Sequence, residues 1–303
     1  MPLTRTHRPD GPLDVRLTLL ALRRGGGDPA WRQTPDGALW WAVRTVDGPG
    51  TVRLTGSPSE ITAESWGPGT ERLLDGLPDL LGAHDDPRRF DPAGHLGLHR
   101  AARAMPGLRM TRSGDLFGAL VPAVLEQRVL TIDAHTAWRF LVARHGTPAP
   151  GPAPEGMRVP PDAAGWREVP VWDWRRAGVD DARTGAVRRA ATVASKLQEA
   201  VDAGSTAELT RRMCLLPGIG PWTAAEVARR VLGDADAVSI GDLHLPRLVG
   251  AALGHRVEHD EVLAALQPWA PHRGRVVRLL ELTEHRAPGS RNRPRPRRAA
   301  RFG

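Results

Sequence analysis

The sequence predicts an α+β protein in which a small antiparallel sheet with flanking helices precedes a mostly α-helical body. Before residue 95, short apolar-alternating runs are separated by turn sequences such as RRGGGDP, TPDG and VDGPG, which is typical of strands and tight turns. Farther along, apolar residues recur at helical spacing. The chain has 303 residues, of which 41% are hydrophobic and 25% charged, so it is long enough for large cores.

The first 95 residues are expected to form the sheet domain. Strands are predicted at residues 15–22, 38–45 and 51–54, with a further one at 61–66, and helices at 70–81 and 95–105. The glycines at 25–27 lack the Lys-Ser/Thr that follows a phosphate-binding loop, so a surface loop is expected there.

Residues 96–285 are expected to form a helical body of two lobes. Two helices are predicted within 114–146, split near residue 130, followed by a proline-rich surface connector at 147–161 and a long helix at 182–203. A final helix is predicted within 268–282. Its Arg273 and Arg275 are candidate phosphate contacts, although solvated charges are an equally good interpretation.

A tight turn joins two further predicted helices, 206–216 and 222–232. The sequence Pro217-Gly218-Ile219-Gly220-Pro221 cannot continue a helix, and its glycines allow unusual dihedral angles and close backbone approach. Free N–H groups at the start of the second helix would bind a phosphate oxygen without reading any base. An ordinary helix-turn-helix corner is the alternative for a bare Gly-x-Gly.

Asp242 precedes another apolar helical pattern, 243–253. Aspartate is a favoured N-cap, so a purely structural role would explain it if it stood alone.

The run LPGIGPWTA, followed about twenty residues later by this aspartate, resembles the helix-hairpin-helix-GPD superfamily of DNA glycosylases, and within it the AlkA-type 3-methyladenine glycosylases. The resemblance implies that Asp242 is the catalytic carboxylate, which stabilises oxocarbenium charge and orients or deprotonates water. It also implies a helix-hairpin-helix body after a small antiparallel sheet.

The resemblance implies further site residues. The base pocket would be lined by Trp222, Glu226, Leu243 and His244. The DNA contacts would come from Pro217, Gly218, Ile219, Gly220, Thr223, Gln127, Arg128, Arg273 and Arg275. Arg128 follows Gln127 at the position of the family's wedge residue. Trp222 would attract a cationic base to its indole face, or would plug the hairpin into the core.

The nucleophile is expected to be water. Superfamily members that also cleave the backbone carry a lysine directly after the hairpin, where this chain has Trp222. Lys196 is the only lysine, and arginine cannot form a Schiff base. We therefore expect a monofunctional enzyme without lyase activity.

Composition limits the other possibilities. The net charge is +8, but seven arginines and no acid fall between residues 286 and 303, so we expect a disordered Arg/Pro-rich tail there. Cys214 is the only cysteine, which excludes an intrachain disulfide and a four-cysteine iron–sulfur cluster. We expect its side chain to pack in the core. We expect no metal and no cofactor. We also expect no membrane span and no signal peptide, and hence a cytoplasmic protein. A monomer is expected as well.

The sequence therefore predicts a DNA glycosylase that flips alkylated, 3-methyladenine-like purines out of damaged double-stranded DNA and hydrolyses the N-glycosidic bond in base-excision repair. The alternative is a non-catalytic helix-hairpin-helix module that binds damaged or distorted DNA. A third reading is an RNA- or partner-binding protein that uses the basic tail.

Overall fold

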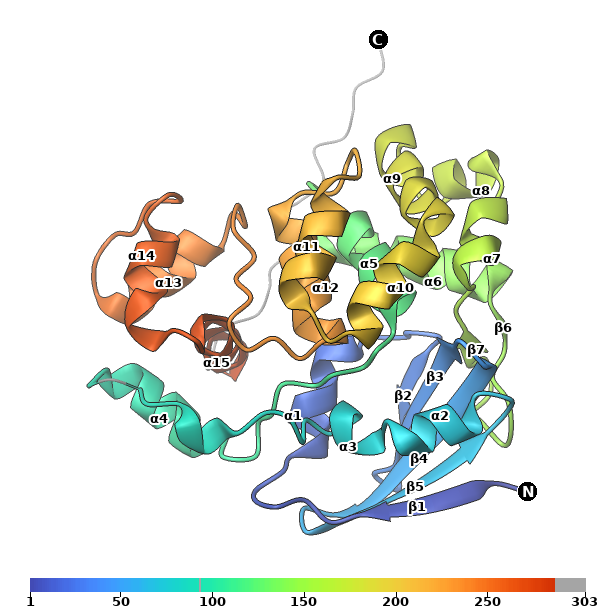
Figure 1. The fold of residues 1–303 in the computed structure, drawn as a ribbon, viewed down its shortest axis with the longest axis horizontal. Coiled ribbons are helices and arrows are strands. Elements are labelled where there is room, and N and C mark those ends of the chain that lie inside the picture. The colour runs from blue at the N-terminus through green and yellow to red at the C-terminus, as the bar shows by residue number, and fades with distance from the viewer. Residues whose placement is uncertain (93, 287–303) are drawn as a thin grey trace.

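The computed structural model describes residues 1–92 and 94–286 and has the predicted α+β class. A five-stranded antiparallel sheet precedes the helical body (Figure 1). Its strands are ordered β1-β5-β4-β3-β2. They are β1 (Leu3–His7), β2 (Trp31–Gln33), β3 (Leu39–Thr45), β4 (Gly48–Ser57) and β5 (Glu60–Trp66).

Three of the four predicted strands exist, as β3, β4 and β5. The strand predicted at residues 15–22 is wrong, because this segment forms helix α1 (Val15–Leu19) and the 3-10 turn η1 (Leu20–Leu22). The carboxylate of Asp14 accepts the Leu17 N–H at 2.9 Å and so caps the helix. The two edge strands, β1 and β2, were not predicted because they are short and β1 is mostly exposed, without a clear apolar alternation.

Both faces of the sheet are covered. Helices α1, α2 (Thr70–Asp75) and α3 (Leu77–Leu80) pack on one face, where Trp41, Val52 and Leu77 are buried in a common core. The proline-rich connector covers the other face, through the short pair β6 (Thr147–Pro148) and β7 (Arg158–Val159). The connector is therefore partly a packing element and not only a surface loop.

The helical body follows the sheet in the chain and packs above it in the view of Figure 1. Its first part comprises α4 (Leu96–Ala104), α5 (Leu116–Leu125), α6 (Thr131–His145), α7 (Ala163–Glu168), α8 (Val171–Arg176), α9 (Asp181–Thr192) and α10 (Ala194–Asp202). Its second part comprises α11 (Thr206–Cys214), α12 (Pro221–Val231), α13 (Leu245–Leu253), α14 (Val262–Leu266), the 3-10 turn η3 (Gln267–Trp269) and α15 (Arg273–Arg286).

Two predicted helices are interrupted. The helix predicted at 70–81 is split into α2 and α3 at Gly76, and the one at 182–203 breaks between α9 and α10 at Val193, whose φ and ψ are −110° and 23°. The two helices predicted within 114–146 are present as α5 and α6.

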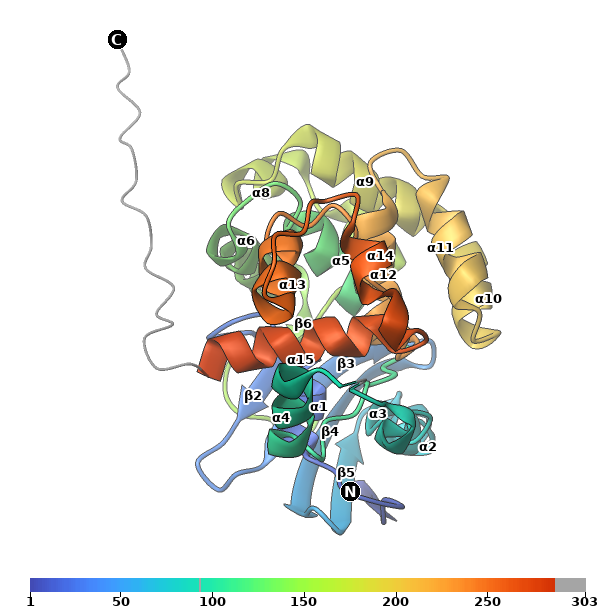
Figure 2. The ribbon, with the colours of Figure 1, turned by 90° about the vertical axis from the view of Figure 1, so that its left-hand side faces the viewer.

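Helix α5 lies at the centre of the main core. Eight of its ten residues are buried, and it packs against α6, α9 and α12. A separate core joins α13, α14 and α15, with α4 on its far side, and Figure 2 shows α15 lying between the α13–α14 pair and α4. The hairpin connects α11 to α12, and its Ile219 is buried in the main core.

Three remaining predictions concern the periphery. Cys214 is exposed, so its expected core position is wrong: it ends α11 on the solvent side, while Met213 takes the buried place. The tail predicted at 286–303 lies outside the described residues apart from its first one. No helix in the described part of the chain is long and apolar enough to cross a membrane.

Candidate active site

The hairpin presents unpaired backbone at the start of α12. Gly218 adopts a φ of 87°, a conformation that side-chain-bearing residues rarely take, and Gly220 is the N-cap of α12, where no side chain caps the helix. Pro217 and Gly218 are exposed, whereas Ile219 is buried and anchors the turn in the main core. The exposed end of α12 therefore has the free N–H groups and positive dipole end that bind an anion.

Asp242 lies beside the first turn of α12. The indole Nε1 of Trp222 donates to Asp242 Oδ2 at 3.2 Å, and the backbone N–H of His244 donates to Oδ1 at 2.8 Å. Each carboxylate oxygen thus has one donor and keeps further lone-pair capacity for a water. The N-cap role that the sequence also allowed for Asp242 is not observed, because α13 begins at Leu245 and His244 is its N-cap.

Trp222 has the core-packing role that the sequence offered as one alternative, and it makes a contact that the sequence did not indicate. The ring is half-buried and packs against the main core, while its N–H reaches the carboxylate. This bond joins two elements twenty positions apart in the sequence, and no spacing pattern predicts it.

The segment that carries Asp242, residues 232–244, is anchored to two helices. The hydroxyl of Ser239 donates to Glu226 Oε1 on α12, and the Ser239 carbonyl accepts the Asp242 N–H at 3.2 Å. At the other end, Asp236 accepts Arg273 Nε at 2.9 Å and the Arg273 N–H at 3.0 Å. The catalytic candidate is therefore held from α12 and from α15.

The expectation that Glu226 lines the base pocket is wrong. Its side chain is only 6% exposed and accepts Arg229 Nη2 at 2.9 Å and Arg230 Nη1 at 2.6 Å. Burial by itself would raise the pKa of Glu226, but the charges of Arg229 and Arg230 and the Ser239 hydrogen bond hold it below its usual value. The family resemblance implied a pocket position for Glu226 after the hairpin, but its side chain points into the protein.

The turn after α5 contacts the hairpin directly. Gln127 Nε2 donates to the Gly218 carbonyl at 3.0 Å and to Thr223 Oγ1 at 2.8 Å. Thr223 is buried, so its hydroxyl serves this contact and is not available to DNA. Arg128 is exposed and is the one non-glycine residue with a positive φ, 55°, in the described part of the chain. This strained conformation projects a cation from the surface next to the hairpin.

The remaining predicted contacts divide into exposed and buried residues. Leu243 is 79% exposed and His244 is exposed, so both flank Asp242 at the surface. Arg275 is 2% exposed and forms an ion pair with buried Asp85, which excludes the predicted phosphate contact. Arg273 is half-buried and paired with Asp236, so its guanidinium holds the Asp242 segment and is not a free phosphate ligand.

One cation beside the hairpin was not predicted. Arg189 on α9 is exposed, and its Nε donates to the Pro217 carbonyl at 3.0 Å. It comes from a helix that is distant in sequence, so only the fold brings it to the turn.

Two cavities, of about 420 and 690 Å³, lie elsewhere, and neither is lined by Trp222 or Asp242. Within the described ranges, no group of three or more His, Cys, Asp or Glu side chains is placed to hold a metal ion. Asp242 itself is a positioned carboxylate next to the uncapped start of α12.

The chain is similar in sequence to a known protein. No protein-family model matches the chain. It is 31% identical over 271 residues to a Mycobacterium tuberculosis protein described as a probable bifunctional transcriptional activator/DNA repair enzyme AlkA, covering 85% of this chain and 52% of that protein. The chain thus spans about half the length of the curated relatives it matches.

Solved structures share the fold. The 3-methyladenine DNA-glycosylase from Archaeoglobus fulgidus matches with a TM-score of 0.75 at 17% identity, over 91% of this chain and 96% of that one. The 8-oxoguanine glycosylase/lyase of Clostridium acetobutylicum, in complex with double-stranded DNA, matches with a TM-score of 0.71 at 11% identity, over 94% and 97%. With this fold, a Gly-x-Gly hairpin followed by Asp242 and 31% identity to a protein described as AlkA, the chain is similar to the helix-hairpin-helix-GPD DNA glycosylases of the AlkA type.

Proposed function

We propose that the protein is a monofunctional DNA glycosylase that excises alkylated purines of the 3-methyladenine kind from double-stranded DNA in base-excision repair. The observation that carries the proposal is the Asp242 carboxylate, held by Trp222 Nε1 at 3.2 Å next to the uncapped start of α12. The name of the Archaeoglobus fulgidus relative, a 3-methyladenine DNA-glycosylase, supports the substrate class.

DNA would be held by its backbone. The N–H groups at the start of α12 bind a phosphate next to the damaged nucleotide, and Arg189 adds a positive charge beside the same turn. Arg128 enters the space that the extruded nucleotide leaves, because it is exposed and its backbone is fixed by the neighbouring Gln127 contacts.

Bond cleavage would then depend on Asp242. An N-alkylated purine carries a positive charge and leaves as a neutral base, so no separate general acid is required. As the bond breaks, the sugar develops oxocarbenium charge, which the carboxylate stabilises while its free lone pairs orient or deprotonate a water. The face of Trp222 would favour the cationic base over a neutral one by roughly 0.5–2 kcal/mol.

The absence of lyase activity is part of this proposal. Position 222, directly after the hairpin, holds tryptophan, and the only lysine, Lys196, lies on α10. Without an amine at the sugar, no Schiff base forms and the DNA strand stays intact. We further propose that the enzyme acts as a monomer and that its sheet domain ends near residue 95, before the helical body of 96–285.

The test is base release from methylated duplex DNA by the wild type and by Asp242→Asn, which keeps the shape of the side chain. We expect free 3-methyladenine from the wild type, a loss of at least about a hundredfold in the variant, and strand breaks only after alkali treatment. If neither protein releases base while both bind DNA, the chain is a binding module and the proposal fails. Strand cleavage without alkali would refute the monofunctional assignment alone.

A further inference from the structure

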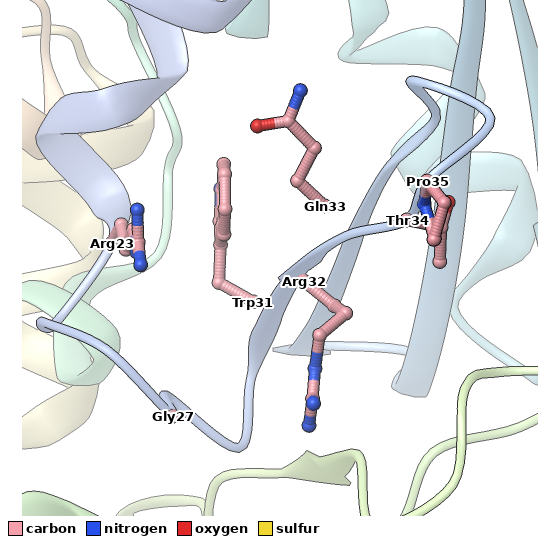
Figure 3. A pocket seen from close by; sticks show the side chains of 7 residues that line it. All are labelled: Arg23, Gly27, Trp31, Arg32, Gln33, Thr34 and Pro35. Carbon is pink, nitrogen blue, oxygen red and sulfur yellow. The ribbon is translucent and has the colours of Figure 1, made fainter.

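A pocket of about 420 Å³ lies at the edge of the sheet domain, outside the site described above. It opens along β2, the edge strand, whose outer side pairs with no other strand of the described chain. The lining residues are Arg23, Gly27, Trp31, Arg32, Gln33, Thr34 and Pro35. Figure 3 shows Arg23 beside the Trp31 ring, with Gln33 on the same side of β2 and Arg32 on the other, so the two guanidinium groups flank the strand edge.

The pocket carries uncompensated positive charge. The guanidinium carbon of Arg23 lies 5.2 Å from the centre of the Trp31 ring, and neither Arg23 nor Arg32 forms an ion pair with any described acid. The Nε of Arg32 is buried and has no hydrogen-bond partner in the described structure. Arg23 Nε donates to the Gly25 carbonyl at 2.9 Å, which leaves its two Nη groups as donors. Guanidinium groups with free donors are ligands for an anion and fit phosphate oxygens in particular.

The nearby acids form no ion pair with these arginines. Asp36, next to Pro35, pairs with Arg53 at 3.0 Å. Asp28 is buried, and its carboxylate accepts the backbone N–H groups of Arg24 at 2.7 Å and Ala30 at 3.0 Å.

The pocket is tied firmly to α6. Trp138 Nε1 on this helix donates to Asp28 at 2.9 Å, and Arg139 Nη1 donates to the Gly26 carbonyl at 2.9 Å. Gly25, with a φ of 71°, lies so close to His135 that a Cβ there would meet its Nδ1 at 2.5 Å. The loop of three glycines is thus clamped in place, which is what a binding site on a loop requires.

This helix also leads to the DNA-contacting surface of the proposed function. It starts at Thr131, three residues after Arg128, and Arg139 lies about 12 Å farther along its axis at 1.5 Å per residue. A DNA strand advances about 3.4 Å per nucleotide, so this distance corresponds to roughly four nucleotides.

We propose that the pocket binds phosphate, and specifically a backbone phosphate of the duplex several nucleotides away from Arg128. This rests on the proposed function only in placing DNA over Arg128 and the hairpin. Arg23 and Arg32 supply the charge and Gln33 an amide donor. A free nucleotide or inorganic phosphate offers the same chemical group, and the experiment separates these sources.

The test compares wild type, Arg23→Gln/Arg32→Gln and a matched control, Arg16→Gln/Arg103→Gln, which removes two exposed arginines that form no ion pair with described acids. Binding of an undamaged 25-base-pair duplex is followed by fluorescence anisotropy between 50 and 200 mM salt. Each lost phosphate contact lowers the slope of log K against log salt by about 0.9, and at 0.1 M salt it weakens binding about eightfold. We expect a change of at least that size in the pocket variant and a smaller one in the control.

A second variant tests the pocket in case the double arginine variant does not fold. Gln33→Glu places a negative charge in the pocket on an exposed side chain, so it disturbs no packing and is expected to weaken duplex binding severalfold, whereas Gln33→Ala is expected to change it much less. In parallel, adenosine monophosphate and inorganic phosphate are titrated into wild type and pocket variant by calorimetry.

A lower slope in the pocket variant together with weaker binding by Gln33→Glu supports a DNA phosphate. If the pocket variant binds the duplex as the wild type does but loses a saturable nucleotide binding that the wild type shows, the pocket is a phosphate site and the DNA assignment is overturned. Unchanged behaviour in both assays overturns the proposal. Because no base release is measured, a protein without glycosylase activity can still show the slope change, so the two proposals fail separately.

Discussion

The hydrogen bond between Trp222 and Asp242 allows the N–H of the tryptophan to be tested separately from its aromatic face by a substitution that keeps an aromatic ring. Trp222→Phe keeps an aromatic face but removes the Nε1–H that lies 3.2 Å from Asp242 Oδ2. A hydrogen bond to a charged acceptor contributes about 1.5–3 kcal/mol, and at this length in a half-buried site we expect the lower end. If the bond orients the carboxylate for the reaction, kcat/KM for base release falls about tenfold.

The assay is single-turnover release of 3-methyladenine from a methylated duplex, with the variant in excess over DNA. Trp222→Ala removes the ring as well and should lose roughly a further 0.5–2 kcal/mol of cation–π attraction. Trp172→Phe, at an exposed tryptophan on α8, is the matched control and should behave as wild type. Full activity of Trp222→Phe would refute the reasoning, since the carboxylate would then not depend on the indole N–H.

Three further predictions concern stability and the strained turn. Asp85→Ala leaves Arg275 buried without its partner, so the free energy of unfolding measured in urea should fall by about 3–5 kcal/mol. Burial raises the pKa of Asp115 from 3.8 to about 6, so the folded state binds the proton more tightly than the unfolded state. Stability should therefore fall as pH rises from about 4 to 6, and Asp115→Asn, which keeps an acceptor for the Gly118 N–H, should remove this dependence; equal pH profiles for both proteins would contradict it. Arg128→Gly relieves about 1–2 kcal/mol of left-handed strain at a cost of about 0.5–1 kcal/mol in backbone entropy, so thermal stability should stay equal or rise slightly. The same substitution removes the side chain and should slow excision about fivefold. A variant that excises at the wild-type rate would exclude the wedge role.

Local sequence predicted those parts of the protein whose structure is decided within one turn or one helix. The hairpin at 217–221, the helices on either side of it and the strands β3 to β5 follow from glycines, prolines and the period of the apolar residues. The strand predicted at 15–22 failed because an alternating apolar run is also compatible with a short helix, and the Asp14 cap decided for the helix.

The wrong predictions within the site concern residues that are buried in the folded protein. Periodicity shows which residues share a helix face, but not whether that face meets solvent or the core. Glu226 and Arg275 were assigned to a pocket and to DNA from their positions, and the structure places both in buried ion pairs. Arg189 and Ser239 were missed because they reach the site from elements that are distant in sequence.

The sequence by itself determined the Gly-x-Gly turn, the place of Asp242 about twenty residues after it and the absence of a lysine at position 222, because each depends on residue type within a short stretch of chain. Only the tertiary structure decided that Trp222 holds Asp242, that Ser239 and Arg273 hold the segment between them, and that Arg23 and Arg32 flank one pocket. These contacts join residues from different elements, and their geometry exists only after the helices and the sheet have packed.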